Sequence, residues 1–119
     1  MERFKLGVVE ARFAEIIWDN APLSTRELVE LCQKELQWKR TTTYTVLKKL
    51  CNRGIFVTKD SMIYTKISRD QFRAIRSESF VQENFQGSLP AFLAAFVSCK
   101  PLTLEELADI KEFVDSYGK

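Results

Sequence analysis

Hydrophobic residues recur with the 3.6-residue period of an amphipathic helix along the first half of the chain. The first such stretch predicts a helix over about Val8–Trp18, which cannot continue through Pro22. The buried face of this helix is expected to consist of Val9, Phe13, Ile16 and Ile17. A second helix is predicted to begin after Ser24, because Ser24 and Glu27 have the spacing of a capping box.

A third helix is predicted from Arg40 to Arg53, and the following Gly54 suits the left-handed residue that commonly ends a helix. Its apolar face consists of Thr43, Val46, Leu47 and Leu50, and its opposite face of Thr41, Thr45, Lys48 and Asn52, flanked by Tyr44 and Lys49. A surface helix usually mixes acidic and basic residues for pairing at i,i+4, and this polar face has no acid. Short hydroxyl groups beside cations favour a helix that approaches DNA bases and phosphates.

The periodicity changes after Gly54 to that of β-strands. Two segments, Ile55–Thr58 and Met62–Ile67, are rich in β-branched and aromatic residues, and three polar residues separate them. This pattern predicts a β-hairpin. Because three helices followed by a hairpin is the order of a winged helix-turn-helix, we expect a DNA-binding domain of this type over residues 1–68.

Three further amphipathic helices are predicted in the remaining part of the chain. Capping patterns at Ser68 and Thr103 begin the first and the last of them, and Pro90 suits the first turn of the helix between them. About fifty residues are too few to close a hydrophobic core alone. The apolar faces therefore require a partner, and a second copy of the chain is the most common one.

Residues 69–119 are accordingly expected to form a helical dimerisation domain. Its interface is predicted to consist of Phe80, Leu89, Phe92, Leu93, Phe96, Leu107, Ile110 and Val114. The predicted fold class is mainly α with a small β-hairpin: a winged helix-turn-helix DNA-binding domain that carries a C-terminal helical dimerisation arm.

The distribution of charge agrees with a DNA-binding third helix. Between Leu36 and Lys59 the chain has six Lys or Arg residues and no Asp or Glu, so this segment carries +6. Since the whole chain is only +2, the rest is −4. A concentrated positive segment is the electrostatic footprint of a nucleic-acid site, although a solvated basic face has the same composition. The residues expected to contact DNA are Ser24, Thr25, Lys39, Arg40, Thr41, Thr42, Tyr44, Thr45, Lys48, Lys49 and Lys59.

An enzyme or a metalloprotein is not expected. The chain has no histidine, which removes the most common general base and metal ligand, and only four glycines from which a phosphate-binding loop could form. Its three cysteines, Cys32, Cys51 and Cys99, are too widely spaced for a thiolate metal pair and odd in number. No catalytic residues, cofactor or bound metal are predicted. No apolar run reaches the roughly 18 residues of a membrane span, and nothing resembles a signal peptide, so we expect a cytoplasmic protein.

In the order and spacing of several short motifs, the chain resembles the penicillinase and methicillin-resistance repressor family. The resemblance covers nearly the whole chain. In the N-terminal half it rests on Ile16-Ile17-Trp18, Pro22-Leu23-Ser24, Thr42-x-x-Thr45-x-Leu47-x-x-Leu50 and Gly54. In the C-terminal half it rests on Ser77-x-Ser79-Phe80, Gly87-Ser88-Leu89, Phe96 and Leu104-Glu105-Glu106-Leu107.

The resemblance implies a homodimer that binds a palindromic DNA operator and represses transcription, with control of β-lactam resistance or related genes. In the antibiotic-resistance branch a membrane sensor-protease system relieves repression, so the resemblance implies a sensor protease as a partner; a small-molecule inducer is the alternative that we consider for this chain. In the antibiotic-resistance branch a protease cuts between Asn and Phe, and the corresponding bond here joins Ala95 and Phe96. Because the asparagine is missing, we expect that this bond is not the switch. No cysteine follows Cys99, which excludes the paired CxC site of the copper-responsive branch.

Two further positions depart from the family pattern. Ala11 stands where the family usually has an aromatic residue, and Lys39-Arg40 stand where it commonly has a proline. The alternative function is that of a protein-interaction module, because winged helices also serve in this way without sequence-specific DNA binding. The hydroxyl-rich face of the third helix favours DNA over a protein partner, whose contact surface would more often be apolar.

Overall fold

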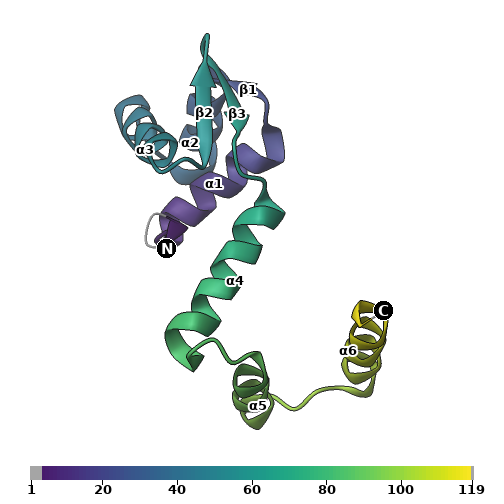
Figure 1. Cartoon of the computed structure of the whole chain (residues 1–119). Helices are drawn as coiled ribbons and strands as arrows, with labels where there is room; N and C mark the ends of the chain where they lie inside the picture. The colour runs from purple at the N-terminus through teal and green to yellow at the C-terminus, as the bar shows by residue number, and fades with distance from the viewer. Residues whose placement is uncertain (1–3, 119) are drawn as a thin grey trace. The chain divides into compact units, whose positions relative to one another are not determined.

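The computed structural model of the chain describes residues 4–118 (Figure 1). Within them lie six helices and three short strands. They follow in the order α1 (Val8–Asn20), β1 (Leu23–Ser24), α2 (Thr25–Leu36), α3 (Arg40–Asn52), β2 (Phe56–Lys59), β3 (Met62–Thr65), α4 (Arg69–Phe85), α5 (Leu89–Cys99) and α6 (Leu104–Tyr117). The chain forms two compact units, Met1–Ser79 and Phe80–Lys119. The predicted fold class is confirmed.

The helices of the N-terminal unit begin and end at local signals. The Ser24 side chain accepts a hydrogen bond of 3.0 Å from the Glu27 backbone N–H, and the Glu27 carboxylate accepts one of 3.0 Å from the Ser24 N–H. Both partners of the predicted capping box are therefore in place at the start of α2. After α3, Gly54 has a φ of 82°, which is the left-handed conformation that a glycine adopts without strain.

The predicted hairpin supplies two strands, β2 and β3, of a three-stranded antiparallel sheet with the order β1-β3-β2. Strand β2 pairs with β3 over Phe56↔Thr65 to Lys59↔Met62, across a turn in which Asp60 and Ser61 both have positive φ. Positive φ at both central residues matches the right-handed twist of the strands. Strand β1 was not predicted: its two residues pair with β3 just before α2 begins.

The core of the N-terminal unit lies between the three helices and the sheet. It consists of Phe4, Phe13, Ala14, Ile16, Ile17, Leu23, Leu28, Cys32, Leu47, Leu50, Ile55, Phe56 and Ile63. The prediction for Val9 was wrong, since this side chain is 49% exposed. Val9 lies in the first turn of α1, and Phe4 from the preceding segment is buried in the core. Burial raises the pKa of the Cys32 thiol to about 11, so this cysteine is a packed apolar group.

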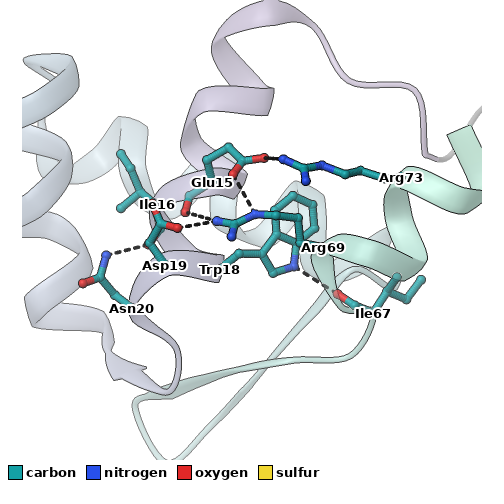
Figure 2. A network of polar contacts seen from close by, with 8 residues as sticks. All are labelled: Glu15, Ile16, Trp18, Asp19, Asn20, Ile67, Arg69 and Arg73. Atoms are coloured by element: carbon teal, nitrogen blue, oxygen red, sulfur yellow. Dashed lines mark hydrogen bonds and ion pairs between the residues drawn. The ribbon is translucent and has the colours of Figure 1, made fainter. Parts of the chain in front are cut away.

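The first part of α4 is fixed to α1 by ion pairs (Figure 2), and aromatic packing adds to them. Arg69 Nε lies 2.8 Å from a Glu15 carboxylate oxygen, and the guanidinium of Arg69 also pairs with Asp19. Trp18 Nε1 donates to the Ile67 carbonyl at 3.0 Å, and the Trp18 ring packs on Phe72 with 5.3 Å between centroids. These contacts explain why the N-terminal unit extends to Ser79, beyond residue 68. The division into functional domains, 1–68 and 69–119, stays a prediction.

The C-terminal unit has well-capped helices but no buried core. The Ser88 side chain accepts from Ala91 N–H at the start of α5, and Thr103 and Glu106 form the predicted capping box of α6. Phe80, Phe85, Phe92 and Phe96 form a chain of ring contacts with centroids 5.6–6.2 Å apart. Even so, no residue among those described in this unit is fully buried. A single chain therefore leaves the apolar faces of α5 and α6 without a cover.

Two negative findings concern residues 4–118. None of their helices combines the length and the apolar character needed to cross a membrane. No group of three or more Cys, Asp or Glu side chains lies close enough together there to hold a metal ion.

Candidate nucleic-acid interface

The candidate interface is the outward face of α3, together with the start of α2 and the hairpin of β2 and β3. Thr43, Leu47 and Leu50 are buried in the core, so their helical spacing turns the opposite face of α3 to solvent. All the α3 residues predicted to contact DNA are exposed; they are Arg40, Thr41, Thr42, Tyr44, Thr45, Lys48 and Lys49. Lys39, before the helix, and Lys59, at the end of β2, are exposed as well. Ser24 and Thr25, at the start of α2, are half-buried.

The hydroxyl group of Thr45 is oriented by its own helix. Thr45 Oγ1 donates a hydrogen bond of 2.9 Å to the carbonyl oxygen of Thr41. This bond uses the only proton of the hydroxyl, so the oxygen offers lone pairs and the side chain offers a methyl group to an approaching molecule. The lone pairs can accept a hydrogen bond from a donor on a base edge, and the methyl group can pack against the methyl group of a thymine.

Tyr44 connects α3 with the start of α2. The Arg40 guanidinium lies over its ring at 5.6 Å from the centroid, and 36% of Tyr44 is exposed. Hydrogen bonds with the side chains of Thr25 and Arg40 lower the pKa of Tyr44. An open pocket next to this group is lined by Ser24, Thr25, Arg26, Val29, Glu30, Arg40, Tyr44 and Ser61. The structure thus brings the predicted residues of α2 and α3 to one surface.

The cations of the basic segment fall into two classes. Lys49 Nζ lies 2.7 Å from one carboxylate oxygen of Glu10, and Arg53 lies 3.8 Å from the other. The hydrogen bond from Lys49, followed by that from Gly7 N–H, lowers the pKa of Glu10 below its usual value. Within residues 4–118 the other four basic residues of this segment form no ion pair; they are Lys39, Arg40, Lys48 and Lys59.

A second groove lies between α3 and the hairpin. Its lining combines α3 residues with hairpin residues: Thr25, Tyr44, Leu47, Lys48, Cys51, Phe56, Val57, Thr58 and Lys66. Lys66, which was not among the predicted residues, follows β3 and donates its backbone N–H to the Ile55 carbonyl at 3.0 Å. The available signal was a second lysine at the hairpin, in the segment Met62–Ile67 that is predicted as its second strand.

The residues predicted for the dimer interface lie in the C-terminal unit, and most are exposed. Phe80, Leu89, Leu93, Phe96, Leu107 and Val114 are 41–59% exposed, and Phe92 and Ile110 are half-buried. Three further apolar side chains on α6 are even more exposed: Leu104, Phe113 and Tyr117. Phe113 stacks on Tyr117 at 5.9 Å between ring centroids. Phe113 was not predicted, because it lies beside the stripe of Leu107, Ile110 and Val114, whose i, i+3, i+7 spacing was the basis of the prediction.

Comparison with known proteins gives one consistent result over nearly the whole chain. A family model described as penicillinase repressor matches residues 6–116. The methicillin resistance regulatory protein MecI of Staphylococcus aureus strain Mu50 is 22% identical over 116 residues, which cover 94% of each chain. The penicillinase repressor of Bacillus licheniformis is 21% identical over 117 residues, which cover 95% of this chain and 91% of the relative. The MecI protein of Mammaliicoccus sciuri is 21% identical over 116 residues, covering 94% of each.

Proposed function

Since the chain belongs to the penicillinase repressor family, it is a DNA-binding transcriptional repressor, and we propose that it acts in the cytoplasm as a homodimer on a palindromic operator. The observation that carries this proposal is the outward face of α3, where hydroxyl groups lie together with Arg40 and Lys48, two cations that have no carboxylate partner within residues 4–118. Its first candidate targets are genes of β-lactam resistance, because the names of its relatives refer to methicillin resistance and to penicillinase.

Each part of this surface has a role in the proposal. Thr41, Tyr44 and Thr45 read base edges from the major groove, and Lys48 binds a phosphate or a guanine. The start of α2 offers the Ser24 and Thr25 hydroxyls and the positive end of a helix to a phosphate, while the N–H groups of Ser24, Thr25 and Glu27 are bonded within the fold. The remaining contacts to the backbone come from Lys39, Arg40, Thr42, Lys59 and Lys66. Lys49 lies on the same surface, where Glu10 holds it.

Lys48→Ala is expected to weaken binding to all duplexes and to lower the salt dependence of binding by about one ion. Lys48 is exposed and within the described residues has no carboxylate partner, so its full charge is available to a phosphate. The measurement is fluorescence anisotropy titration of a labelled duplex at several salt concentrations. Lys111→Ala, an equal change of charge on exposed α6, serves as the control. If both variants show the same salt slope, Lys48 does not contact a phosphate, and the assignment of α3 to the DNA interface is contradicted.

The homodimer in this proposal is formed by the C-terminal unit. Two winged helices joined in this way bind two half-sites, and the second binding event is then intramolecular. The support is the exposed apolar surface of α5 and α6, which one chain does not cover. A symmetric dimer explains why the operator is proposed to be a palindrome, since its half-sites mirror the two-fold axis.

Repression is proposed to end without cleavage between Ala95 and Phe96, through a small-molecule inducer or a sensor protease of other specificity. Cleavage within α5 would separate α6 from the rest of the chain and forfeit the avidity of the dimer. The dipeptide Asn84-Phe85 occurs at the end of α4 instead. We expect that the intact mass of the protein in cells exposed to a β-lactam shows no fragment ending at Ala95. Such a fragment would contradict the proposal.

A further inference from the structure

Glu10 in α1 holds two cations of the basic segment through a side chain that is itself fixed. As the N3 residue of α1, it accepts a hydrogen bond of 3.1 Å from the Gly7 backbone N–H through Oε1. The same oxygen lies 3.8 Å from Arg53, and Oε2 lies 2.7 Å from Lys49 Nζ. Because the helix cap determines its conformation, Glu10 is positioned against α3 before any ligand arrives.

The two cations differ in how firmly they are held. The Arg53 guanidinium also donates to the Lys5 carbonyl at 3.1 Å, and its side chain is only 25% exposed. The Lys49 side chain is 52% exposed, and Glu10 is the carboxylate that holds it. Arg53 is thus fixed within the N-terminal unit by two contacts. Lys49 lies at the surface of α3, and the Glu10 carboxylate of α1 neutralises its charge.

A neutralised lysine contributes little to DNA binding. Phosphate contacts by lysine and arginine supply essentially all of the non-specific affinity of a protein for DNA, through release of counterions. For Lys49 to make such a contact, it must first give up the Glu10 carboxylate, and the freed carboxylate then repels the phosphates.

Resting on the proposed function, we propose that Glu10 is a specificity-determining residue that withholds Lys49 from the phosphates of non-operator DNA. On the operator, the base contacts of Thr41, Tyr44 and Thr45 fix the position of α3, and Lys49 stays with Glu10. On other sequences no base contact fixes the helix, and the complex takes the pose that brings most cations to phosphates. The pairing therefore weakens non-operator binding more than operator binding.

Glu10→Gln tests this proposal, because glutamine keeps the oxygen that caps α1 and removes the charge. The probes are a duplex selected from a random pool by the wild-type protein, and a shuffled duplex of the same composition. For Glu10→Gln we expect affinity for the shuffled duplex to rise about three- to tenfold at low salt, and its salt slope to increase by about one. Affinity for the selected duplex should change less, so the ratio of the two affinities falls.

The matched control is Glu106→Gln. Glu106 is also the N3 residue of a capping box, in α6, and its substitution changes the net charge by the same amount. Glu106→Gln should leave both affinities at the wild-type level. The proposal is overturned if the affinities of Glu10→Gln match those of this control, or if its affinity rises by the same factor for both duplexes. If the wild-type protein selects and binds no duplex, the proposed function itself fails, which is a different outcome.

Lys49→Gln gives a second test that does not depend on the stability of Glu10→Gln. A withheld lysine predicts that Lys49→Gln weakens binding to the shuffled duplex less than Lys48→Ala does, because it removes no phosphate contact and adds only the repulsion of the freed Glu10 carboxylate. In the double variant Glu10→Gln/Lys49→Gln the gain in affinity should disappear. Loss of binding by Lys49→Gln as large as that by Lys48→Ala, or a gain that persists in the double variant, would contradict the role given to Glu10.

Discussion

Phe96→Asp is expected to convert the protein to a monomer and to lower its affinity for the operator at least about a hundredfold. In a single chain Phe96 is 45% exposed, at the end of a chain of ring contacts that runs through Phe92. In the proposed dimer it is covered, and an aspartate there would be a buried charge without a partner. Sedimentation velocity measures the first effect, and titration of a full operator against a single half-site measures the second.

The control for this prediction is Ser98→Asp, which places the same charge on α5 two residues later. Ser98 is exposed, and its hydroxyl donates to the Ala95 carbonyl of its own helix at 2.8 Å. This variant should stay dimeric. Phe96 is a better probe than Phe92, since Phe92 contacts Phe80, Phe85 and Phe96 and holds the C-terminal unit together. A Phe96→Asp protein that sediments as a dimer with normal helix content would move the interface elsewhere.

Thr45→Ala is expected to cost about 1–3 kcal/mol of binding free energy on the operator, or roughly 5- to 150-fold in affinity. On a shuffled duplex it should cost little, because a threonine carries no charge for a phosphate. The helix itself should not suffer, since alanine has the higher helix propensity. Paired titrations of the two duplexes with wild-type and variant protein provide the measurement.

Ser77→Ala is the matched control for the loss of the hydroxyl. The Ser77 hydroxyl also bonds a carbonyl of its own helix, that of Ala74 at 3.0 Å, but it lies on α4. It should leave both duplexes unaffected. An equal loss on both duplexes with Thr45→Ala would mean that Thr45 supports the fold and reads no base, and no loss at all would exclude it from the contact.

The parts of the fold that the sequence predicted well are those with local causes. Capping boxes at Ser24 and Thr103 concern residues three apart, and both form as predicted. The left-handed Gly54 is likewise a property of one residue and its neighbours. Such signals locate helix ends without any knowledge of the tertiary structure.

The parts that were missed depend on contacts between distant segments. Strand β1 has two residues, too few for any periodicity, and exists because Leu23 and Ser24 pair with β3. The start of α4 joins the N-terminal unit through Arg69, whose carboxylate partners lie about fifty residues earlier in α1. Neither pairing has a signature in a single sequence.

The same distinction applies to the candidate interface. The facial division of α3 is a local property, and the burial of Thr43, Leu47 and Leu50 agrees with it. The charge that the segment presents to a ligand is not a local property. Counting cations along the sequence treats Lys48 and Lys49 as equal, although Lys49 is paired with a carboxylate and Lys48 forms no ion pair within the described residues. Only the fold reveals that Glu10 reaches Lys49, since a carboxylate in α1 contributes nothing to a count over residues 36–59.

Selection of duplexes from a random pool by the purified full-length protein tests the central claim most directly. A homodimer that reads DNA through α3 predicts an enriched palindrome, with half-sites about one helical turn apart, or a multiple of it. The Phe96→Asp variant should lose the symmetric site and retain at most weak preference for one half-site. Absence of any enriched sequence at moderate salt would contradict the account, and would favour a winged helix that binds an acidic protein partner.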